Sequence, residues 1–360
     1  MVIFNEKMKK ITFPDYVSEI RRPVDPPEYV VKEGISVFGT FTAPLKHINF
    51  NDCLKPCGKK MPDFLKPFRL KQWFAYLIDF NQGFILSAVY DTGPVRFNVI
   101  SFFNKETRKA QSNMVFALKK KDIFPDTLID SEIFLKAGQF SQKIRNNLEN
   151  GKISIKAHYP GDKKNFSYQA DVTLDSISMP SVVVMPLGEN KPLYIHKELF
   201  KASGKIVIGD QNFILDEKAI CAIDDHKGYY PYHMEYDWVS GFQNNDGNGP
   251  VAFNLVDNQV LNPDDYNENF IWINGEMHPV PPVKVIKKTD MLWFVKDNYG
   301  VVDLKFEIED DFVKNVNVPC FKANYRAPYG KISGFIKDLE GIKHDMTGTF
   351  GVGEDLDYKY

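Results

Sequence analysis

The sequence has no long apolar run that is free of charge. No window of about 18 residues is both apolar and uncharged, so we expect no transmembrane helix. The most apolar long stretch, 73–90, is broken by Asp79, Asn81 and Gln82. The N-terminus also lacks a basic stretch followed by about 7–15 apolar residues, which a signal peptide needs. These absences predict a cytoplasmic protein with no integral membrane segment.

Neither sign of charge is in excess. The 360 residues contain 45 Lys and Arg against 47 Asp and Glu, which gives a net charge of −2. Domains that bind nucleic acid usually carry a strongly basic surface, and the overall charge supplies no such field. We therefore expect no nucleic-acid partner. The composition gives no information about the oligomeric state.

Cysteine is scarce, with four residues in the whole chain. That number is too small for a disulfide framework. The Cys53 and Cys57 pair has no second close pair and no histidine at ligand spacing, so we expect no zinc site there. The sequence also lacks Gly-x-Ser-x-Gly, P-loop, Rossmann and His-Glu-x-x-His patterns. We therefore predict neither a metal nor a cofactor.

Aromatic residues are abundant: 29 Phe, 17 Tyr and 4 Trp make up 14% of the chain. Such residues favour strands and line apolar or sugar-stacking pockets. The clearest periodicity is two, with apolar and polar residues alternating over 302–308, 153–157 and 166–174. This alternation is typical of strands with one buried face.

Turn signals separate these strands at short intervals. The loop 159–165 predicts a hairpin between 153–157 and 166–174, and 209–212 predicts another. Asn274-Gly275 is the dipeptide of a type I′ turn, because both central residues need a positive φ. The segment 132–148 has some helical spacing but is interrupted by Gly138, so it fits a helix or strands equally.

Strands that recur every 8–12 residues, with turns between them, predict an all-β protein of sandwiches or barrels with little helix. The Pro-rich start predicts an extended lead-in over 1–30. The segment 179–188 is interrupted by Pro180, Pro186 and Gly188, and it predicts a boundary between two barrel-like domains, 31–188 and 189–360. We place the candidate site in the second of them.

The segment 221–241 mixes titratable and aromatic residues more densely than any other. If 232–238 is a strand, its side chains alternate between two faces. His233, Glu235 and Asp237 then share one face, an arrangement that suits proton transfer. The other face carries Tyr232, Met234, Tyr236 and Trp238.

Other interpretations of this segment remain open. A strand with a solvated polar face and an aromatic face in the core has the same pattern, and the polar face could also hold a divalent metal. The preceding Asp224, Asp225 and His226 are typical of a solvated loop taken alone. Their closeness to the strand suggests that the two segments form one cluster.

The run from Asp224 to Pro231, leading into Glu235-Tyr-Asp-Trp238, resembles the signature of the family called domain of unknown function 2804. Lys71-Gln-Trp73 and Phe350-Gly-Val-Gly-Glu354-Asp355 agree with this resemblance more weakly. The family is distantly similar to two-domain lipocalin-like proteins, which include carotenoid hydratases, fungal cycloaddition enzymes and a ceramide-handling survival factor. The resemblance implies a double barrel with an apolar small-molecule pocket in a barrel or between the domains.

We expect a hydrophobic small molecule as the partner. Acid–base residues would move protons in a hydration, isomerisation or cyclisation. The alternatives are a non-catalytic carrier of a lipid or polyene and a carbohydrate-acting protein with paired carboxylates. The candidate catalytic residues are His233, Glu235, Asp237 and Glu354. The candidate ligand-binding residues are Asp224, Asp225, His226, Tyr229, Tyr230, Tyr232 and Trp238.

Overall fold

The computed structural model describes residues 13–93, 95–118, 123–245, 249–318 and 321–359. Strands make up 62% of the structure and helices 5%, which confirms the predicted all-β class. Within the described residues, no helix has the length and hydropathy needed to cross a bilayer. The chain forms two compact units, Asp25–Pro231 and Tyr232–Tyr360, and the second also includes the N-terminal segment up to Val24.

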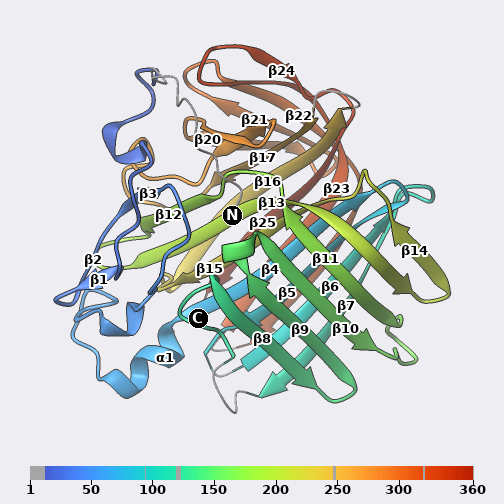
Figure 1. Ribbon diagram of the computed structural model, residues 1–360, viewed down its shortest axis with the longest axis horizontal. Coiled ribbons are helices and arrows are strands. Elements are labelled where there is room, and N and C mark those ends of the chain that lie inside the picture. Colours follow the sequence, from blue (N-terminus) through green and yellow to red (C-terminus); the bar gives the residue numbers. More distant parts are fainter. Residues whose placement is uncertain (1–12, 94, 119–122, 246–248, 319–320, 360) are drawn as a thin grey trace. The chain divides into compact units, whose positions relative to one another are not determined.

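The first unit contains a 13-stranded antiparallel sheet (Figure 1). Its main path runs β7-β6-β5-β4-β15-β13-β11-β10-β9-β8, and the end strands β7 and β8 approach each other, so the sheet is a nearly closed barrel. The strands of this path are β4 (Lys71–Phe80), β5 (Gly83–Asp91), β6 (Val95–Asn104), β7 (Lys109–Leu118), β8 (Asp130–Ala137), β9 (Phe140–Asn147), β10 (Lys152–Tyr159), β11 (Tyr168–Ser176), β13 (Pro192–Ile208) and β15 (Ile220–Gly228).

Shorter elements complete the first unit. Strand β12 pairs with β13 and β3, strand β14 pairs with β13, and β1 pairs with β2. Their bounds are β1 (Val31–Lys32), β2 (Ile35–Ser36), β3 (Gly39–Phe41), β12 (Ser181–Pro186) and β14 (Gln211–Leu215). The helical turns are α1 (Lys66–Arg69) and the 3₁₀ segments Phe50–Asp52, Asp63–Leu65 and Leu148–Asn150.

The barrel forms because alternate residues of its strands are apolar. On β8, every second side chain is buried, and the same holds on β10 and β11. These side chains join one core inside the barrel. The predicted hairpins at 153–174 and 206–215 are confirmed as β10–β11 and β13–β14. The ambiguous segment 132–148 is a third hairpin, in which Gly138 takes a left-handed conformation (φ 59°) between β8 and β9.

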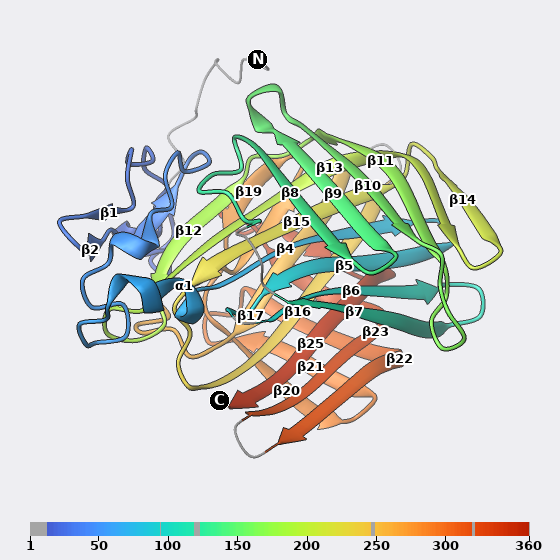
Figure 2. The ribbon, with the colours of Figure 1, turned by 90° about the horizontal axis from the view of Figure 1, so that it is seen from below.

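The second unit contains a 10-stranded antiparallel sheet in the form of a half-barrel (Figure 2). Its order is β19-β18-β17-β16-β25-β23-β22-β21-β20, and β24 pairs with β23. The strands are β16 (His233–Asn245), β17 (Gly249–Asp257), β18 (Phe270–Ile273), β19 (Glu276–Pro279), β20 (Val283–Thr289), β21 (Leu292–Asp297), β22 (Val302–Val318), β23 (Phe321–Lys337), β24 (Lys343–Asp345) and β25 (Thr349–Lys359).

The core of the second unit is built around Trp293 and Phe306, whose rings meet edge to face. Alternation over 302–308, at the start of β22, buries the apolar residues as predicted. Asn274 and Gly275 both have positive φ, 51° and 84°, so the predicted turn between β18 and β19 is confirmed.

The expected boundary near Gly188 falls in the turn between β12 and β13, two strands that pair with each other in the first sheet. The compact units divide instead between Pro231 and Tyr232. Of the predicted lead-in 1–30, residues 1–12 lie outside the described residues. The part that follows contains a 3₁₀ turn, Glu19–Arg21, and Arg21 donates hydrogen bonds to two backbone carbonyls of the second unit, at Val280 (2.6 Å) and Asn269 (2.9 Å).

Candidate functional site

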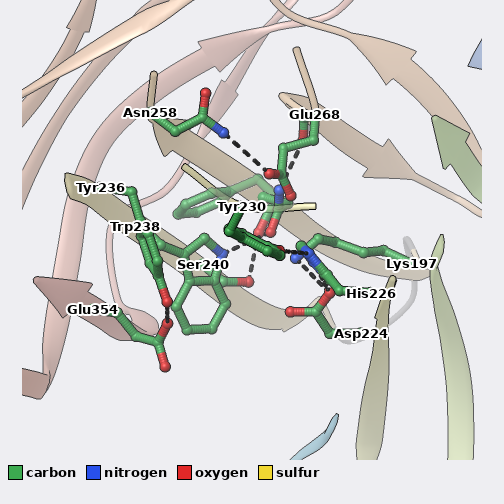
Figure 3. Close-up of polar contacts among 12 residues, drawn as sticks. Lys197, Asp224, His226, Tyr230, Tyr236, Trp238, Ser240, Asn258, Glu268 and Glu354 are labelled. Atoms are coloured by element: carbon green, nitrogen blue, oxygen red, sulfur yellow. Dashed lines mark hydrogen bonds and ion pairs between the residues drawn. The ribbon is translucent and has the colours of Figure 1, made fainter. Parts of the chain in front are cut away.

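Asp224 and His226 lie on β15 rather than in a loop, and they share the face that points away from the barrel core. The His226 Nε2 atom is 2.7 Å from Asp224 Oδ1, and the Lys197 Nζ atom on the neighbouring β13 is 2.9 Å from the same oxygen (Figure 3). All three side chains are largely buried. The structure therefore joins two predicted residues and one unpredicted lysine in a single ion cluster.

The Asp224 carboxyl is ionised in this cluster. Burial alone would raise its pKa, but His226 and Lys197 outweigh that effect and hold the pKa below its ordinary value. An ionised carboxylate accepts the Nε2–H of an imidazole and so fixes the orientation of the ring. The other ring nitrogen, His226 Nδ1, lies 3.4 Å from the Tyr230 hydroxyl.

An aromatic row begins at His226 and crosses the sheet. The His226 ring stacks on Trp73, with ring centres 4.3 Å apart and planes 16° apart. Trp73 is directly opposite both His226 on β15 and Tyr90 on β5. The row continues through Tyr90, Phe97 and Phe116, one residue from each successive strand, and Phe116 is 60% exposed. These rings form a continuous aromatic surface beside the Asp224–His226 pair.

Asp225 points to the opposite face of β15, where it lies across from His196 of β13. It is only 5% exposed. Burial raises the pKa of Asp225 to about 7, with Lys227 opposing the rise and Asp224 adding to it. Tyr229 has a different position, in an apolar cluster where its hydroxyl donates to the Phe50 carbonyl (3.3 Å). Its surroundings are those of a packing residue.

The alternation predicted for 232–238 is present in β16, but its polar face is largely solvated. The side chains of His233 and Glu235 are 44% and 59% exposed. His233 Nε2 lies 2.9 Å from Asp357 Oδ1 and 3.1 Å from Glu235 Oε1. Ligand atoms of these three residues lie within 4.8 Å of one another, so they could hold a metal ion. Asp237 is more buried, and its partner is Lys287 at 2.8 Å.

Glu354 lies on the other face of this sheet, because it is paired with Trp238 across β16 and β25. The Tyr236 hydroxyl donates to its carboxylate at 2.7 Å (Figure 3). The Tyr325 hydroxyl donates to the same carboxylate, also at 2.7 Å. Trp238 Nε1 donates to Asn254 Oδ1 at 2.7 Å. The structure thus places Glu354 on the opposite face from His233, Glu235 and Asp237, so these four candidate catalytic residues do not form one group. Tyr232 is exposed.

The residues of these clusters that were not in the predicted set include Lys197, Trp73 and Tyr325. Lys197 and Tyr325 are placed by strand pairing with β15 and β25, and nothing in their local sequence marks them. Trp73 could have been identified from the sequence, because it belongs to the motif Lys71-Gln-Trp73 that supports the family resemblance.

Comparison with solved structures shows the same fold elsewhere. Two crystal structures of CghA, one of them with Sch210972, resemble this chain with TM-scores of 0.53 and 0.52 at 9% identity. Kievitone hydratase from Nectria haematococca gives a TM-score of 0.49 at 13% identity. Each comparison covers 81% of this chain and 88% of the other.

The similarity to CghA agrees with the predicted all-β fold. No curated protein matches the sequence significantly. A family profile, in contrast, spans nearly the whole chain. The protein belongs to the family described as "Domain of unknown function (DUF2804)", whose profile matches residues 19–360.

Proposed function

We propose that this protein binds a lipophilic small molecule and that Asp224 and His226 act on it as an acid–base pair. The observation that carries the proposal is the contact between the buried His226 imidazole and the ionised Asp224 carboxylate, at 2.7 Å. A carboxylate that orients an imidazole prepares its other nitrogen to accept or donate a proton. Tyr230, beside Nδ1, is placed to relay that proton.

The aromatic row supports the apolar character of the ligand. Trp73, Tyr90 and Phe97 present partly exposed rings on the face of the sheet that carries His226. Stacked and offset aromatic surfaces suit flat or polyunsaturated molecules. CghA, which has a similar fold, has been crystallised with Sch210972, and this supports small-molecule binding by analogy of fold. The reaction class that fits is proton transfer, as in hydration, isomerisation or cyclisation.

A non-catalytic carrier is the second candidate function. The observation in its favour is Lys197, which contacts the same Asp224 oxygen as His226 and completes an ion cluster. Such a cluster could anchor the polar end of a ligand without any proton transfer. Both the enzyme and the carrier would bind the ligand, but only the enzyme would convert it to a product.

The test uses the molecule that copurifies with the full-length protein, identified by native mass spectrometry and solvent extraction. The extracted molecule is incubated with wild-type protein, with His226→Gln and with His344→Gln, and products are followed by liquid chromatography–mass spectrometry. His344 is a matched control because it also pairs with a carboxylate, Asp338, at 2.8 Å. We expect His226→Gln to slow conversion by about 100-fold or more, while His344→Gln has no such effect. Binding without conversion by wild-type protein would favour the carrier.

A further inference from the structure

The barrel of the first unit carries uncharged polar side chains in the middle of its apolar core. Ser87 lies between the core residues Ile85 and Val89 on β5, and Gln142 lies between Phe140 and Ile144 on β9. Because side chains alternate along a strand, both polar residues point into the barrel. Both are at least nine-tenths buried.

Hydrogen bonds join these residues across the barrel. The Tyr76 and Ser87 hydroxyls each donate to Gln142 Oε1 at 3.2 Å. The Tyr76 and Tyr168 hydroxyls are 2.9 Å apart, and Asn98 Nδ2 donates to Ser87 at 3.5 Å. Strands β5 and β9 are not neighbours in the sheet, so Gln142 reaches the opposite wall. We call Tyr76, Ser87, Asn98, Gln142 and Tyr168 the lumen cluster.

The lumen cluster is incompletely satisfied. Within the described residues, Gln142 Nε2 has no acceptor and Asn98 Oδ1 has no donor. Among these described residues, Asn113 Oδ1 also has no hydrogen-bond donor. Asn113 on β7 and Ser87 on β5 both pair with Ile100 of β6, so the two side chains point to the same face of the sheet. Native proteins pair nearly all buried polar atoms with protein groups, ligands or ordered water. One free donor and two free acceptors in one lumen therefore point to a group that they bind.

The lumen cluster is also uncharged at neutral pH. Burial raises the pKa of Tyr76 to about 12 and raises the pKa of Tyr168 well above its usual value, so both phenols keep their protons. The other three members are a hydroxyl and two amides. A charged ligand group placed here would lose its hydration and gain no opposite charge in return.

We propose that the lumen of this barrel is a second binding site, for a neutral molecule with a hydroxyl or carboxamide head. The head accepts from Gln142 Nε2 and donates to Asn98 Oδ1, and the apolar body lies among the core side chains. This site is distinct from Asp224 and His226, which point to the opposite face of the barrel wall. It does not depend on the proposed function of that pair.

The test is isothermal titration calorimetry of the full-length protein with 1-octanol and, at pH 8, with octanoate. Gln142→Met keeps the length of the side chain and removes its polar atoms. Tyr76 and Ser87 each keep a second partner, Tyr168 and Asn98. The matched control is Gln169→Met, the same substitution at an exposed position of β11. His226→Gln separates the lumen from the other face.

We expect 1-octanol to bind wild-type protein, Gln169→Met and His226→Gln alike, and to bind Gln142→Met at least 10-fold more weakly. We expect octanoate to bind wild-type protein at least 10-fold more weakly than 1-octanol. The comparison of the two probes needs no variant, so it holds even if Gln142→Met fails to fold. Three results would overturn the proposal: no binding of 1-octanol to wild-type protein, equal binding of 1-octanol to Gln142→Met and to wild-type protein, or equal affinity of wild-type protein for octanoate and 1-octanol. Any of them would assign the free amide atoms to ordered water.

Discussion

Asp225→Asn gives the sharpest prediction about stability, because Asp225 is a buried carboxyl whose proton is held by the fold. Its pKa is raised by burial from 3.8 to about 7. The folded protein therefore binds this proton more tightly than the unfolded chain between about pH 4 and pH 7. The contribution of Asp225 to the free energy of unfolding is therefore at its maximum below about pH 4, and it is lost as the pH rises from about 4 to about 7. Asparagine has a similar shape and no proton to lose.

The size of the effect follows from the width of the window. One pKa unit corresponds to about 1.36 kcal/mol, and the part of the window between pH 5 and pH 7 is about two units wide. Wild-type protein should then lose about 3 kcal/mol of unfolding free energy from Asp225 between pH 5 and pH 8. Asp225→Asn should not suffer this loss, so the difference between variant and wild type should move by about 3 kcal/mol in favour of the variant.

The assay is urea unfolding of both proteins at pH 5, 6, 7 and 8, with Asp171→Asn as the control. Asp171 lies on β11 at an exposed position, where its partner Lys156 is also exposed. A variant-to-wild-type difference that stays constant from pH 5 to pH 8 would show that Asp225 is ionised throughout, and the account of its environment would be wrong.

Three further substitutions test other contacts, each by urea unfolding. Asp224→Ala leaves the buried His226 without its carboxylate and should destabilise the protein by about 3–5 kcal/mol; a loss below about 1 kcal/mol would mean that the cluster is solvated. Trp238→Phe removes the donor to Asn254 and should cost about 1–3 kcal/mol, and an unchanged midpoint would contradict the bond. Gly204→Ala places a Cβ 2.2 Å from a carbonyl oxygen of β11 at φ 120°, so it should cost more than about 1 kcal/mol, and wild-type stability would refute the close approach.

Strand positions could be predicted from the sequence because each strand carries its own signal. Alternation marked β10, β11 and the start of β22, and Asn274-Gly275 marked the turn between β18 and β19. The segment 132–148 could not be assigned, because its apolar residues fit both the helical spacing and the two-residue spacing of a strand. Only the pairing of β9 with β10, which the sequence does not reveal, decides for strands. No local sequence signal marked Pro231 as the end of the first compact unit.

The candidate site was less accessible to sequence reasoning. Alternation predicted correctly that His233 and Glu235 share a face, but it does not say which face meets solvent. Glu354 was grouped with them, and only the register of β16 with β25 places it opposite Trp238 instead. Lys197 joins Asp224 through pairing of β13 with β15. Such contacts depend on long-range register, which no short motif encodes.

The most direct test of the central claim is native mass spectrometry of the full-length protein purified from cell extract, with the bound fraction extracted into organic solvent. The account predicts a mass above that of the chain, carried by one apolar small molecule at a fixed ratio. It also predicts that Trp73→Ala, which removes the ring stacked on His226, lowers the bound fraction while the protein stays folded. Preparations that show only the bare mass of the chain, and that take up no apolar molecule when one is supplied, would contradict the claim that this protein binds a lipophilic ligand.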